Sequence, residues 1–512
     1  MGNSRIKKPR FMPALVLLLF IASACYFMSR AVFLAFAGYG PFEKVLSIFF
    51  FLAEFFVMFH AFGYFSNIYR LSKVQVTEVK EGEVEERVAP PPRRFPQVAV
   101  LIPARHEPKD VLESTVVSCY NIDYPSKTIY ILDDSSEKSY MDEAMEISQR
   151  YGAKLFRRQT RHGAKAGVIN DCMKTLDEEY MAIFDVDQNP MPDFLKKLVP
   201  FLEDDAKLAF VQTPQFYSNL TSGKVSFGAQ MQQSVFYEYV CEGKNSDQAM
   251  ICCGTNVVMR RQALLDVGGL DESTVTEDFA TSLYLQLKGW RTMYYNHVNT
   301  FGMGPTDLGA YFQQQDRWAR GNIGVLKIII SRFFRSPFSL KPAQWFEYLI
   351  TGSYYLIGCA YIFLIFCPIL YIFFNIPSFF MNPVVYSLAF IPYFLLSVGI
   401  FYVSMGRKKY SPLQLFEGQA LMFLTLPVFI GAAVGSLLGF KGTFKVTSKA
   451  SGARISYLKL WPQLFLWSIS LSAITWGINR LYYERTVAVL INIVWILYHF
   501  ILLSFLFYYD ED

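Results

Sequence analysis

The sequence predicts an α/β domain with a doubly wound, mostly parallel sheet, inserted into an α-helical multi-pass membrane domain. Of the 512 residues, 53% are hydrophobic and 17% are aromatic, an apolar content above that of ordinary soluble domains. This content is uneven, because long uncharged runs lie on both sides of a charged segment at residues 70 to 345. Within that segment short β-rich runs alternate with helical stretches, which is the pattern of a parallel sheet covered by helices.

Charge and cysteine usage exclude several classes of function. The net charge of +5 is small for a chain of this length, and the charged segment contains no basic stripe interleaved with aromatic residues. We therefore expect no nucleic acid partner. The eight cysteines show neither zinc-ligand spacing nor a disulfide framework, so reduced thiols in a cytosolic environment are expected.

Residues 1 to 69 are expected to hold two N-terminal transmembrane helices. The apolar runs at 11 to 29 and 44 to 68 are each close to the roughly 20 residues that cross a bilayer. Basic residues ahead of the first run place the N-terminus inside. Two crossings return the chain to the cytoplasm, so the α/β domain is expected to be cytoplasmic, after a linker at 70 to 95.

Four further spans are expected after the α/β domain. The expected segments are an interfacial helix at 331 to 347, transmembrane helices 3 and 4 within 348 to 405, an interfacial or re-entrant helix with a loop within 406 to 456, and transmembrane helices 5 and 6 with a short tail within 457 to 512. The apolar run at 411 to 440 joins two basic loops, and a full crossing would put one of them outside. A seventh span remains the alternative for that run.

A pair of carboxylates follows the second predicted strand of the charged segment. The strand covers 128 to 132 and is followed by Asp133 and Asp134. Ligands of doubly wound sheets gather at the carboxyl ends of the strands. Two acceptors there suit the N–H and hydroxyl groups of a nucleotide base and ribose, whereas capping of the following helix is the alternative.

A second pair of carboxylates, Asp185 and Asp187, follows the predicted strand at 180 to 184. Alternate residues of an extended chain point the same way, so the two carboxylates are expected to converge on one site. Oxygen ligands of this kind suit Mg²⁺ or Mn²⁺, and a metal there would offset the charge of a diphosphate. A turn with two solvated acids is the alternative.

Two further elements supply a candidate base and a flat apolar surface. Thr276, Glu277 and Asp278 stand at the start of a predicted helix, where acidic residues also act as caps. A carboxylate at a rigid helix tip can take a proton from a sugar hydroxyl, and Asp278 is the candidate. Arg317 could pair with a diphosphate, and Trp318 offers a face on which a pyranose stacks. An amphipathic helix near the membrane is the alternative for this last element.

Taken together, the four elements resemble the processive family 2 glycosyltransferases of the cellulose synthase type. That family carries an Asp-Asp pair, a DxD, a TED and a QxxRW motif, found here at Asp133/Asp134, Asp185/Asp187, Thr276 to Asp278, and Gln314 to Trp318. In addition, Lys165-Ala166-Gly167 resembles the donor-site lysine segment of the family, and Cys253-Gly254-Thr255-Asn256 resembles its acceptor-site segment. The resemblance implies a GT-A glycosyltransferase domain at 96 to 330.

The resemblance also implies a role for each matching residue. The residues that would contact the nucleotide sugar or the acceptor are Asp133, Asp134, Lys165, Asp185, Thr276, Glu277, Gln314, Arg317 and Trp318. Asp278 would be the catalytic base, and Asp185 and Asp187 would hold Mg²⁺ or Mn²⁺. The reaction would invert the anomeric centre by a single displacement, so an α-linked donor would give β linkages without a covalent sugar–enzyme intermediate.

A further match lies beyond the charged segment. Phe444-Lys445-Val446-Thr447-Ser448-Lys449 resembles the FxVTxK gating loop of bacterial cellulose synthases, which implies gating roles for Phe444, Val446, Thr447 and Lys449. From the residues alone, a basic loop that binds lipid headgroups is the alternative.

The chain also departs from the family in two places. Residues 104 to 107 read Ala-Arg-His-Glu where the bacterial enzymes carry Thr-Tyr-Asn-Glu, which leaves the base contacts there open. The chain ends at Asp512, so regulation by a C-terminal cyclic-dinucleotide domain is not expected.

The expected function is polymerisation of a β-linked polysaccharide from nucleotide sugars, with export across the membrane. A β-glucan made from UDP-glucose is the first expectation. The alternatives are another donor, such as UDP-N-acetylglucosamine or GDP-mannose, and transfer of one sugar to a lipid carrier. A transporter with an inactive soluble domain is disfavoured, because the full set of carboxylates would have no use there and the spans hold few charges.

The expected location is the plasma membrane. The expected partners are a nucleotide sugar, most simply UDP-linked, the growing polysaccharide, the lipid bilayer and accessory export subunits.

Overall fold

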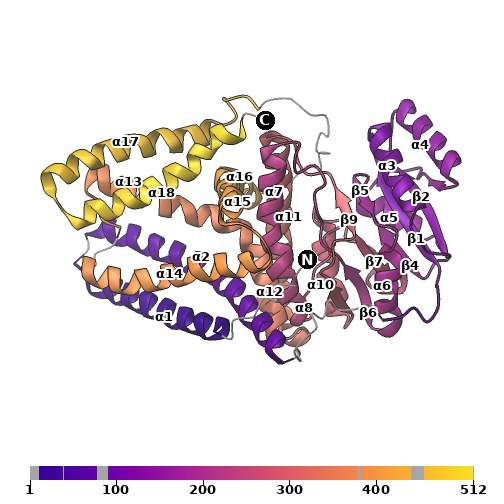
Figure 1. The fold of residues 1–512 in the computed structure, drawn as a ribbon, viewed down its shortest axis with the longest axis horizontal. Coiled ribbons are helices and arrows are strands. Elements are labelled where there is room, and N and C mark those ends of the chain that lie inside the picture. Colours follow the sequence, from indigo (N-terminus) through magenta and orange to yellow (C-terminus); the bar gives the residue numbers. More distant parts are fainter. Residues whose placement is uncertain (1–10, 39, 78–89, 379–381, 440–454, 511–512) are drawn as a thin grey trace, which may run out of the picture.

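The computed structural model describes residues 11–38, 40–77, 90–378, 382–439 and 455–510. An α/β domain lies at one end of the molecule and a group of long helices lies at the other (Figure 1). The four residues predicted to form a gating loop, namely Phe444, Val446, Thr447 and Lys449, lie outside the described residues.

A seven-stranded sheet with the order β3-β2-β1-β4-β7-β6-β8 organises the α/β domain. Its strands are β1 (Val98–Ala104), β2 (Lys127–Asp133), β3 (Lys154–Phe156), β4 (Tyr180–Ile183), β6 (Leu208–Gln212), β7 (Val257–Arg260) and β8 (Arg291–Tyr294). All neighbouring pairs are parallel except those of β7, which is antiparallel to β4 and β6. The predicted mostly parallel sheet is therefore confirmed. A separate antiparallel pair consists of β5 (Gln188–Pro190) and β9 (Thr300–Gly302).

Helices cover both faces of this sheet, as predicted for a doubly wound fold. Successive residues of β1 point to opposite faces, so Val98 and Val100 lie in one buried cluster and Ala99 and Leu101 lie in another. The first cluster includes residues of α3 (Lys109–Tyr120), α4 (Lys138–Tyr151) and α6 (Phe194–Asp204), and the second includes residues of α5 (Ala164–Met173), α9 (Arg261–Val267) and α10 (Glu277–Leu287). Burial on both faces explains why the strands read as continuous apolar runs.

The α/β domain packs directly on the long helices. The elements between the sheet and the long helices are α7 (Lys224–Val235), α8 (Cys241–Ser246), α11 (Leu308–Arg335) and α12 (Pro342–Ser353) (Figure 1). Along the chain, the π-helix η1 (Phe236–Val240) joins α7 to α8, and the 3₁₀ turn η2 (Pro337–Ser339) lies between α11 and α12. Val225 of α7 and Tyr311 of α11 belong to the same buried cluster as Leu421, Phe429 and Tyr509 from the second half of the chain. One continuous apolar core therefore joins the two parts.

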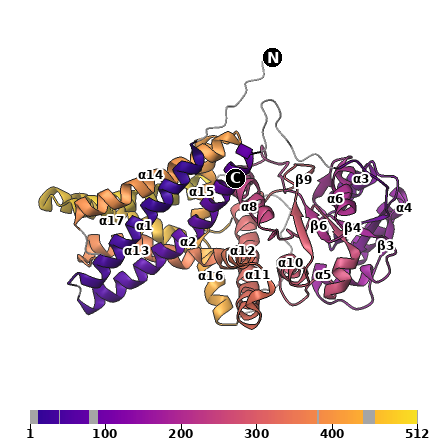
Figure 2. The same ribbon diagram turned by 90° about the horizontal axis from the view of Figure 1, so that it is seen from below.

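A group of long helices extends away from the α/β domain in both views (Figures 1 and 2). They are α1 (Met12–Phe36), α2 (Pro41–Thr77), α13 (Ile357–Phe374), α14 (Pro383–Arg407), α17 (Trp461–Glu484) and α18 (Val487–Tyr509), and the 3₁₀ turn η3 (Tyr354–Leu356) joins α12 to α13. These positions correspond to the six predicted spans.

Hydropathy alone selects a slightly different set of spans. Within the described part of the chain, six helical segments are long and apolar enough to cross a membrane, which makes this a multi-pass membrane protein. Five of them coincide with predicted spans, but the sixth is Pro412–Leu437, and α17 is not in the set. The polar residues Ser468, Ser472, Thr475 and Asn479 lower the hydropathy of α17.

Within the described residues 411 to 439, the apolar run predicted as an interfacial or re-entrant element is interrupted at Thr425, whose backbone itself stays in the right-handed helical region. It forms α15 (Pro412–Leu424) and α16 (Leu426–Leu437), which meet at Thr425 with a proline in the first turn of α16. Figure 1 looks nearly along α16, whereas α1, α2, α13, α14 and α17 run across the view. The α16 helix packs on α11 and α13, and α15 packs on α7 and α18.

Two predicted boundaries were wrong. Residues 331 to 347 do not form one interfacial helix, because the end of α11, the turn η2 and the start of α12 divide them. Residues 70 to 77, expected as linker, continue α2. Arg480 and Glu484 lie inside α17 and pair with each other at 2.7 Å, which supports the last turn of this helix.

Candidate active site

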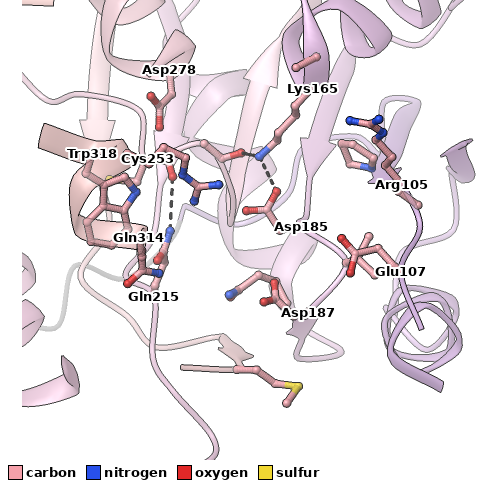
Figure 3. A pocket seen from close by; sticks show the side chains of 18 of the residues that line it. Arg105, Glu107, Lys165, Asp185, Asp187, Gln215, Cys253, Asp278, Gln314 and Trp318 are labelled. Carbon is pink, nitrogen blue, oxygen red and sulfur yellow. Dashed lines mark hydrogen bonds and ion pairs between the residues drawn. The ribbon is translucent and has the colours of Figure 1, made fainter. Parts of the chain in front are cut away.

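A pocket of about 260 Å³ opens beyond the carboxyl ends of β1, β2 and β4 and reaches the start of α10 and one face of α11 (Figure 3). The predicted site residues in its wall are Asp134, Lys165, Asp185, Asp187, Thr276, Glu277, Asp278, Gln314, Arg317 and Trp318. The fold therefore brings all four sequence motifs to one place. Asp133 is not in the wall of this pocket.

The two aspartates at the end of β2 have different surroundings. Asp133 is 3% exposed and pairs with Arg157 at 2.8 Å. Asp134 accepts two hydrogen bonds of 2.8 Å from Arg158, one on each carboxylate oxygen, and a third of 2.9 Å from Arg161. Neither aspartate caps α4, because the helix starts after Glu137 without a side-chain cap. Asp134 therefore lines the pocket, whereas Asp133 faces the interior and accepts a hydrogen bond from the N–H of Ser135 at 3.0 Å within the turn.

Lys165 joins three parts of the pocket wall. Its ammonium donates hydrogen bonds to the Asp185 carboxylate at 2.5 Å and to the backbone carbonyl of Gly254 at 2.8 Å. Burial lowers the pKa of Lys165, but the negative charges of Asp185, Glu277 and Asp278 outweigh this effect and leave the pKa raised. The lysine is therefore a fixed positive charge beside the carboxylates.

Gly254 permits the close approach of these groups. Its φ of +82° is in the left-handed region, which side chains rarely adopt. A Cβ atom at this position would lie 3.0 Å from Oδ2 of Asp278 and 3.6 Å from Nζ of Lys165. The glycine in the predicted acceptor-site segment thus brings the backbone against both side chains.

Asp185 and Asp187 both line the pocket, in the turn that follows β4. The backbone N–H of Asp185 donates to Oγ1 of Thr255 at 2.9 Å, which fixes the turn against the acceptor-site segment. The described residues contain no cluster of three or more His, Cys, Asp or Glu that could hold a metal alone. Two carboxylates suit Mg²⁺ or Mn²⁺ that takes its other ligands from a diphosphate and water, as Mg²⁺ commonly does.

Asp278 stands in the first turn of α10 with its side chain toward the pocket (Figure 3). Its Oδ1 accepts a hydrogen bond from the backbone N–H of Phe279 at 2.8 Å, which is one of the N–H groups at the helix start that have no partner within the helix. Burial is the main cause that raises the pKa of Asp278, and burial together with the Asp278 charge raises the pKa of Glu277. Raised carboxylate pKa values in a pocket are typical of acid–base residues.

Gln314, Arg317 and Trp318 share one face of α11, because residues three and four apart are neighbours on a helix. One turn later, Gly321 lets α11 approach the loop before α10. A Cβ atom at Gly321 would lie 2.4 Å from Cγ2 of Thr276. This contact places Trp318 and Asp278 on adjoining walls of the pocket (Figure 3).

Several wall residues were not predicted from the sequence. They are Arg105 and Glu107 after β1, Gln215 and Tyr217 after β6, and the loop at 303 to 306. The charged pair after β1 carried a signal, because side chains that follow a parallel strand gather at the ligand-binding edge. Gln215 and Tyr217 follow β6, which pairs antiparallel with β7, and the loop at 303 to 306 follows β9 of the separate antiparallel pair. The sequence did not reveal either pairing.

A second cavity of about 560 Å³ adjoins the pocket. The residues that border both are Gln215, Cys253, Thr276, Asp278 and Trp318. From there the cavity extends between helices, and its wall includes Tyr64 and Asn67 of α2, Glu347 of α12, Tyr354 and Tyr355 of η3, Phe401 of α14 and Met422 of α15. Aromatic rings and amides therefore line a path from Asp278 toward the long helices.

Comparison with known proteins gives relatives over the same region. Residues 96–321 match a family model described as "Glycosyltransferase like family 2". Cellulose synthase 2 of Novacetimonas hansenii is 30% identical over 407 residues, which cover 76% of this chain and 24% of that protein. The cellulose synthase catalytic subunit of Pseudomonas fluorescens is 28% identical over 431 residues, which cover 81% of this chain and 56% of that protein. The cellulose synthase catalytic subunit of Xanthomonas axonopodis pv. citri is 35% identical over 246 residues, which cover 46% of this chain and 33% of that protein.

This chain thus spans between 24% and 56% of the length of these relatives. Among solved structures, a mannosyltransferase of Pyrobaculum calidifontis in complex with GDP-Man and Mn²⁺ gives a TM-score of 0.45 at 15% identity, covering 83% of this chain and 99% of that chain. The sheet topology, the four motifs around one pocket and the family match agree with one another. The segment from residue 96 to residue 321 is a family 2 glycosyltransferase domain of the cellulose synthase type.

Proposed function

We propose that the chain is an inverting, processive membrane hexosyltransferase that builds a β-linked polysaccharide from nucleotide sugars and passes it across the membrane. Asp278 and Trp318 border both the pocket with the diphosphate-binding groups and the cavity among the helices. A sugar chain whose last unit stacks on Trp318 would have its earlier units in that cavity.

In the proposed reaction, a hydroxyl group of the acceptor attacks the anomeric carbon of the donor sugar. The new C–O bond forms as the bond from the anomeric carbon to the diphosphate oxygen breaks, and the nucleoside diphosphate leaves with the electron pair. Asp278 takes the hydroxyl proton, and its raised pKa suits this role because a base is most effective near the working pH. A single displacement inverts the centre, so an α-linked donor gives a β linkage.

The positive side chains of the pocket would stabilise the leaving diphosphate. Lys165 already lies against Asp185, and Arg317 on α11 has a guanidinium suited to bidentate binding of phosphate. Asp185 and Asp187 would hold Mg²⁺ or Mn²⁺, which when bound offsets the charge of the diphosphate. Asp134 would contact the nucleoside, and Gln314 would support the acceptor end.

The lining of the second cavity supports passage of a polymer rather than transfer to a lipid carrier. Pyranose rings present apolar faces to aromatic side chains and hydroxyl groups to amides. The cavity offers both, with Tyr64, Tyr354, Tyr355 and Phe401 among its rings and Asn67 among its amides. This composition continues from the catalytic pocket into the region of the long helices.

We also propose that the helices cross the plasma membrane with the α/β domain in the cytoplasm. The basic N-terminus and the cluster at 407 to 409 favour this orientation. The break at Thr425 and the orientation of α16 across the other helices support an interfacial α15–α16 pair (Figure 1). In that case α17 is the sixth span despite its polar residues.

The proposed donor is UDP-glucose, and the proposed product is a β-glucan. The support is similarity to proteins named cellulose synthases, some of which are described as UDP-forming. UDP-N-acetylglucosamine and GDP-mannose are the alternative donors.

The test is a donor screen with the full chain in lipid nanodiscs. Radiolabelled UDP-glucose, UDP-N-acetylglucosamine and GDP-mannose are each supplied with Mg²⁺ or Mn²⁺, and products are digested with linkage-specific glycosidases. We expect one donor to give a long, glycosidase-sensitive polymer, with Asp278→Asn as the inactive control. Accumulation of a lipid-linked monosaccharide without polymer would show that the processive function is wrong.

A further inference from the structure

Gln212, the last residue of β6, binds the backbone of the predicted acceptor-site segment at 253 to 256. Its side chain is fully buried and is not part of the pocket wall. Oε1 of Gln212 accepts a hydrogen bond from the backbone N–H of Cys253 at 2.8 Å, and Nε2 donates one to the backbone carbonyl of Thr255 at 2.7 Å. One carboxamide therefore holds the chain on both sides of Gly254.

These hydrogen bonds stand in for strand pairing. The strand β7 begins at Val257, so residues 253 to 256 lie outside the sheet and their buried backbone groups need other partners. Nε2 of Gln212 also lies 3.2 Å from the carbonyl oxygen of Asn256, to which the hydroxyl of Thr213 donates at 3.0 Å. The end of β6 thus supplies the bonds that a neighbouring strand would otherwise supply.

A second buried side chain holds the start of the same segment from α10. The backbone N–H of Cys252 donates to Oγ of Ser282 at 2.8 Å, and this hydroxyl donates to the backbone carbonyl of Asp278 at 2.7 Å. Ser282 is fully buried. Because Gln212 and Ser282 bind the backbone just before Gly254, the position of this glycine is fixed relative to both β6 and the first turn of α10.

Gly254 in turn fixes the distance between two groups of the pocket. Its carbonyl accepts a hydrogen bond from the Lys165 ammonium at 2.8 Å, and Lys165 also binds Asp185 (Figure 3). On the other side, a Cβ atom at Gly254 would lie only 3.0 Å from Oδ2 of Asp278. A shift of this glycine would therefore move the Lys165 ammonium relative to the Asp278 carboxylate. A misplacement of about 1 Å can cost roughly a hundredfold in rate.

We infer that Gln212 is a positioning residue for sugar transfer, which holds Gly254 against Lys165 and Asp278 through the backbone of Cys253 and Thr255. This inference rests on the proposed function, because it requires the transfer reaction in this pocket. The Gln212 side chain lies outside the pocket wall, so its effect on the reaction passes through the segment that it binds.

Two substitutions of Gln212 separate its hydrogen bonds from its volume. Gln212→Met has an unbranched side chain of similar length and removes both the acceptor for Cys253 and the donor for Thr255. Gln212→Glu keeps the acceptor, but its ionised form faces the Thr255 carbonyl without a donor, whereas its protonated form again carries one O–H donor. Gln212→Glu therefore turns the bond to Thr255 into one that depends on pH.

Gln286→Met is the matched control. Gln286 is also a buried glutamine, and its Nε2 donates to the carbonyl of Met250 and to Oγ1 of Thr292, both at 3.0 Å, away from the pocket and the adjoining cavity. The full chain in nanodiscs is assayed with the nucleotide sugar that gives polymer in the donor screen. Initial rates give kcat, calorimetry gives the affinity for the nucleoside diphosphate of that donor, and thermal melting gives Tm.

We expect Gln212→Met to lower kcat about tenfold to a hundredfold, while the nucleotide affinity stays within about threefold, because Lys165 keeps its contact with Asp185. Gln286→Met should keep kcat within about twofold of wild type at temperatures well below its Tm, even if that Tm falls as far. The kcat of Gln212→Glu relative to wild type should rise as pH falls from about 8 to about 6, because burial raises the pKa of a carboxyl and its protonation restores the donor.

Three results would overturn the inference and leave the proposed function standing, provided that wild-type protein makes polymer. They are a near-normal kcat in Gln212→Met, an equal loss of kcat in Gln286→Met, and a nucleotide affinity that falls together with kcat. If Gln212→Met does not fold, the pH series decides, and a ratio of Gln212→Glu to wild type that is constant with pH would overturn the inference. Wild-type protein that transfers no sugar from any donor would refute both proposals.

Discussion

Replacement of Asp278 by asparagine tests the proposed chemistry most directly. The change keeps the shape of the side chain and an oxygen that can accept the hydrogen bond from Phe279, which is 2.8 Å long in the structure. It removes the group that would take the proton of the acceptor hydroxyl. General base catalysis contributes about 10²–10⁴-fold in rate. We therefore expect kcat to fall by this factor, equal to roughly 3–5 kcal/mol of barrier.

Donor binding should survive the same change. Asp278 lies at the start of α10, beyond the groups that would hold the diphosphate, so the affinity for UDP should stay within about threefold of wild type, a difference below 1 kcal/mol. Initial rates of sugar incorporation and calorimetric titration of UDP measure the two quantities separately. Asp266→Asn is the matched control, because Asp266 bonds Gln262 and Trp290 away from the pocket. Near-normal kcat in Asp278→Asn would remove this residue as the base.

Three further predictions concern the walls of the site. Gly254→Ala should reduce kcat at least tenfold, because the φ of +82° at this position disfavours a side chain and the new Cβ would lie 3.0 Å from Oδ2 of Asp278. Wild-type kcat in steady-state assays would contradict the prediction. Trp318→Ala should shorten the polymer more than it slows the first transfer, because the indole ring borders both cavities. Gel filtration of labelled product measures the polymer length, and an unchanged length would count against the stacking role. His162 bridges Glu272 at 2.6 Å and Asp171 at 2.8 Å, and these contacts, Glu272 first, raise its pKa. The folded state therefore holds the His162 proton more tightly than the unfolded state, so the bridge stabilises the fold at low pH and this contribution is lost as pH rises through the raised pKa. His162→Gln should accordingly lower the melting temperature more at pH 6 than at pH 8.5, and an equal loss at both would refute the charge argument.

The sequence supplied most of the residues of the candidate site. Asp134, Asp185 and Asp187 could be placed together because carboxylates that follow parallel strands lie at one edge of such a sheet. Asp278 was added to them by its position at a helix start and by the resemblance to a known family, and it lines the same pocket. That inference requires that the strands run parallel, but it does not require their exact order in the sheet. It depends on local chemistry and on short separations along the chain.

Other parts of the site could not be foreseen from the sequence. Asp133 and Asp134 are adjacent in sequence, yet one faces Arg157 in the interior and the other faces the pocket. Gln215 and Tyr217 come from beyond β6, which reaches the site only because β7 inserts antiparallel between β4 and β6. Such pairings depend on long-range packing that no local pattern encodes.

The membrane region divides in the same way. Long apolar runs determine that helices of sufficient length exist, because the backbone in lipid must satisfy its own hydrogen bonds. The sequence by itself thus determined a membrane protein with an inserted α/β domain and the chemistry of its four motifs. Only the tertiary structure decided that α15 and α16 break at Thr425 and that the cavity beyond Asp278 runs between α2, α12 and α14. The physical reason is that a cavity is enclosed by side chains far apart in sequence, whose meeting is fixed by packing and not by any one segment.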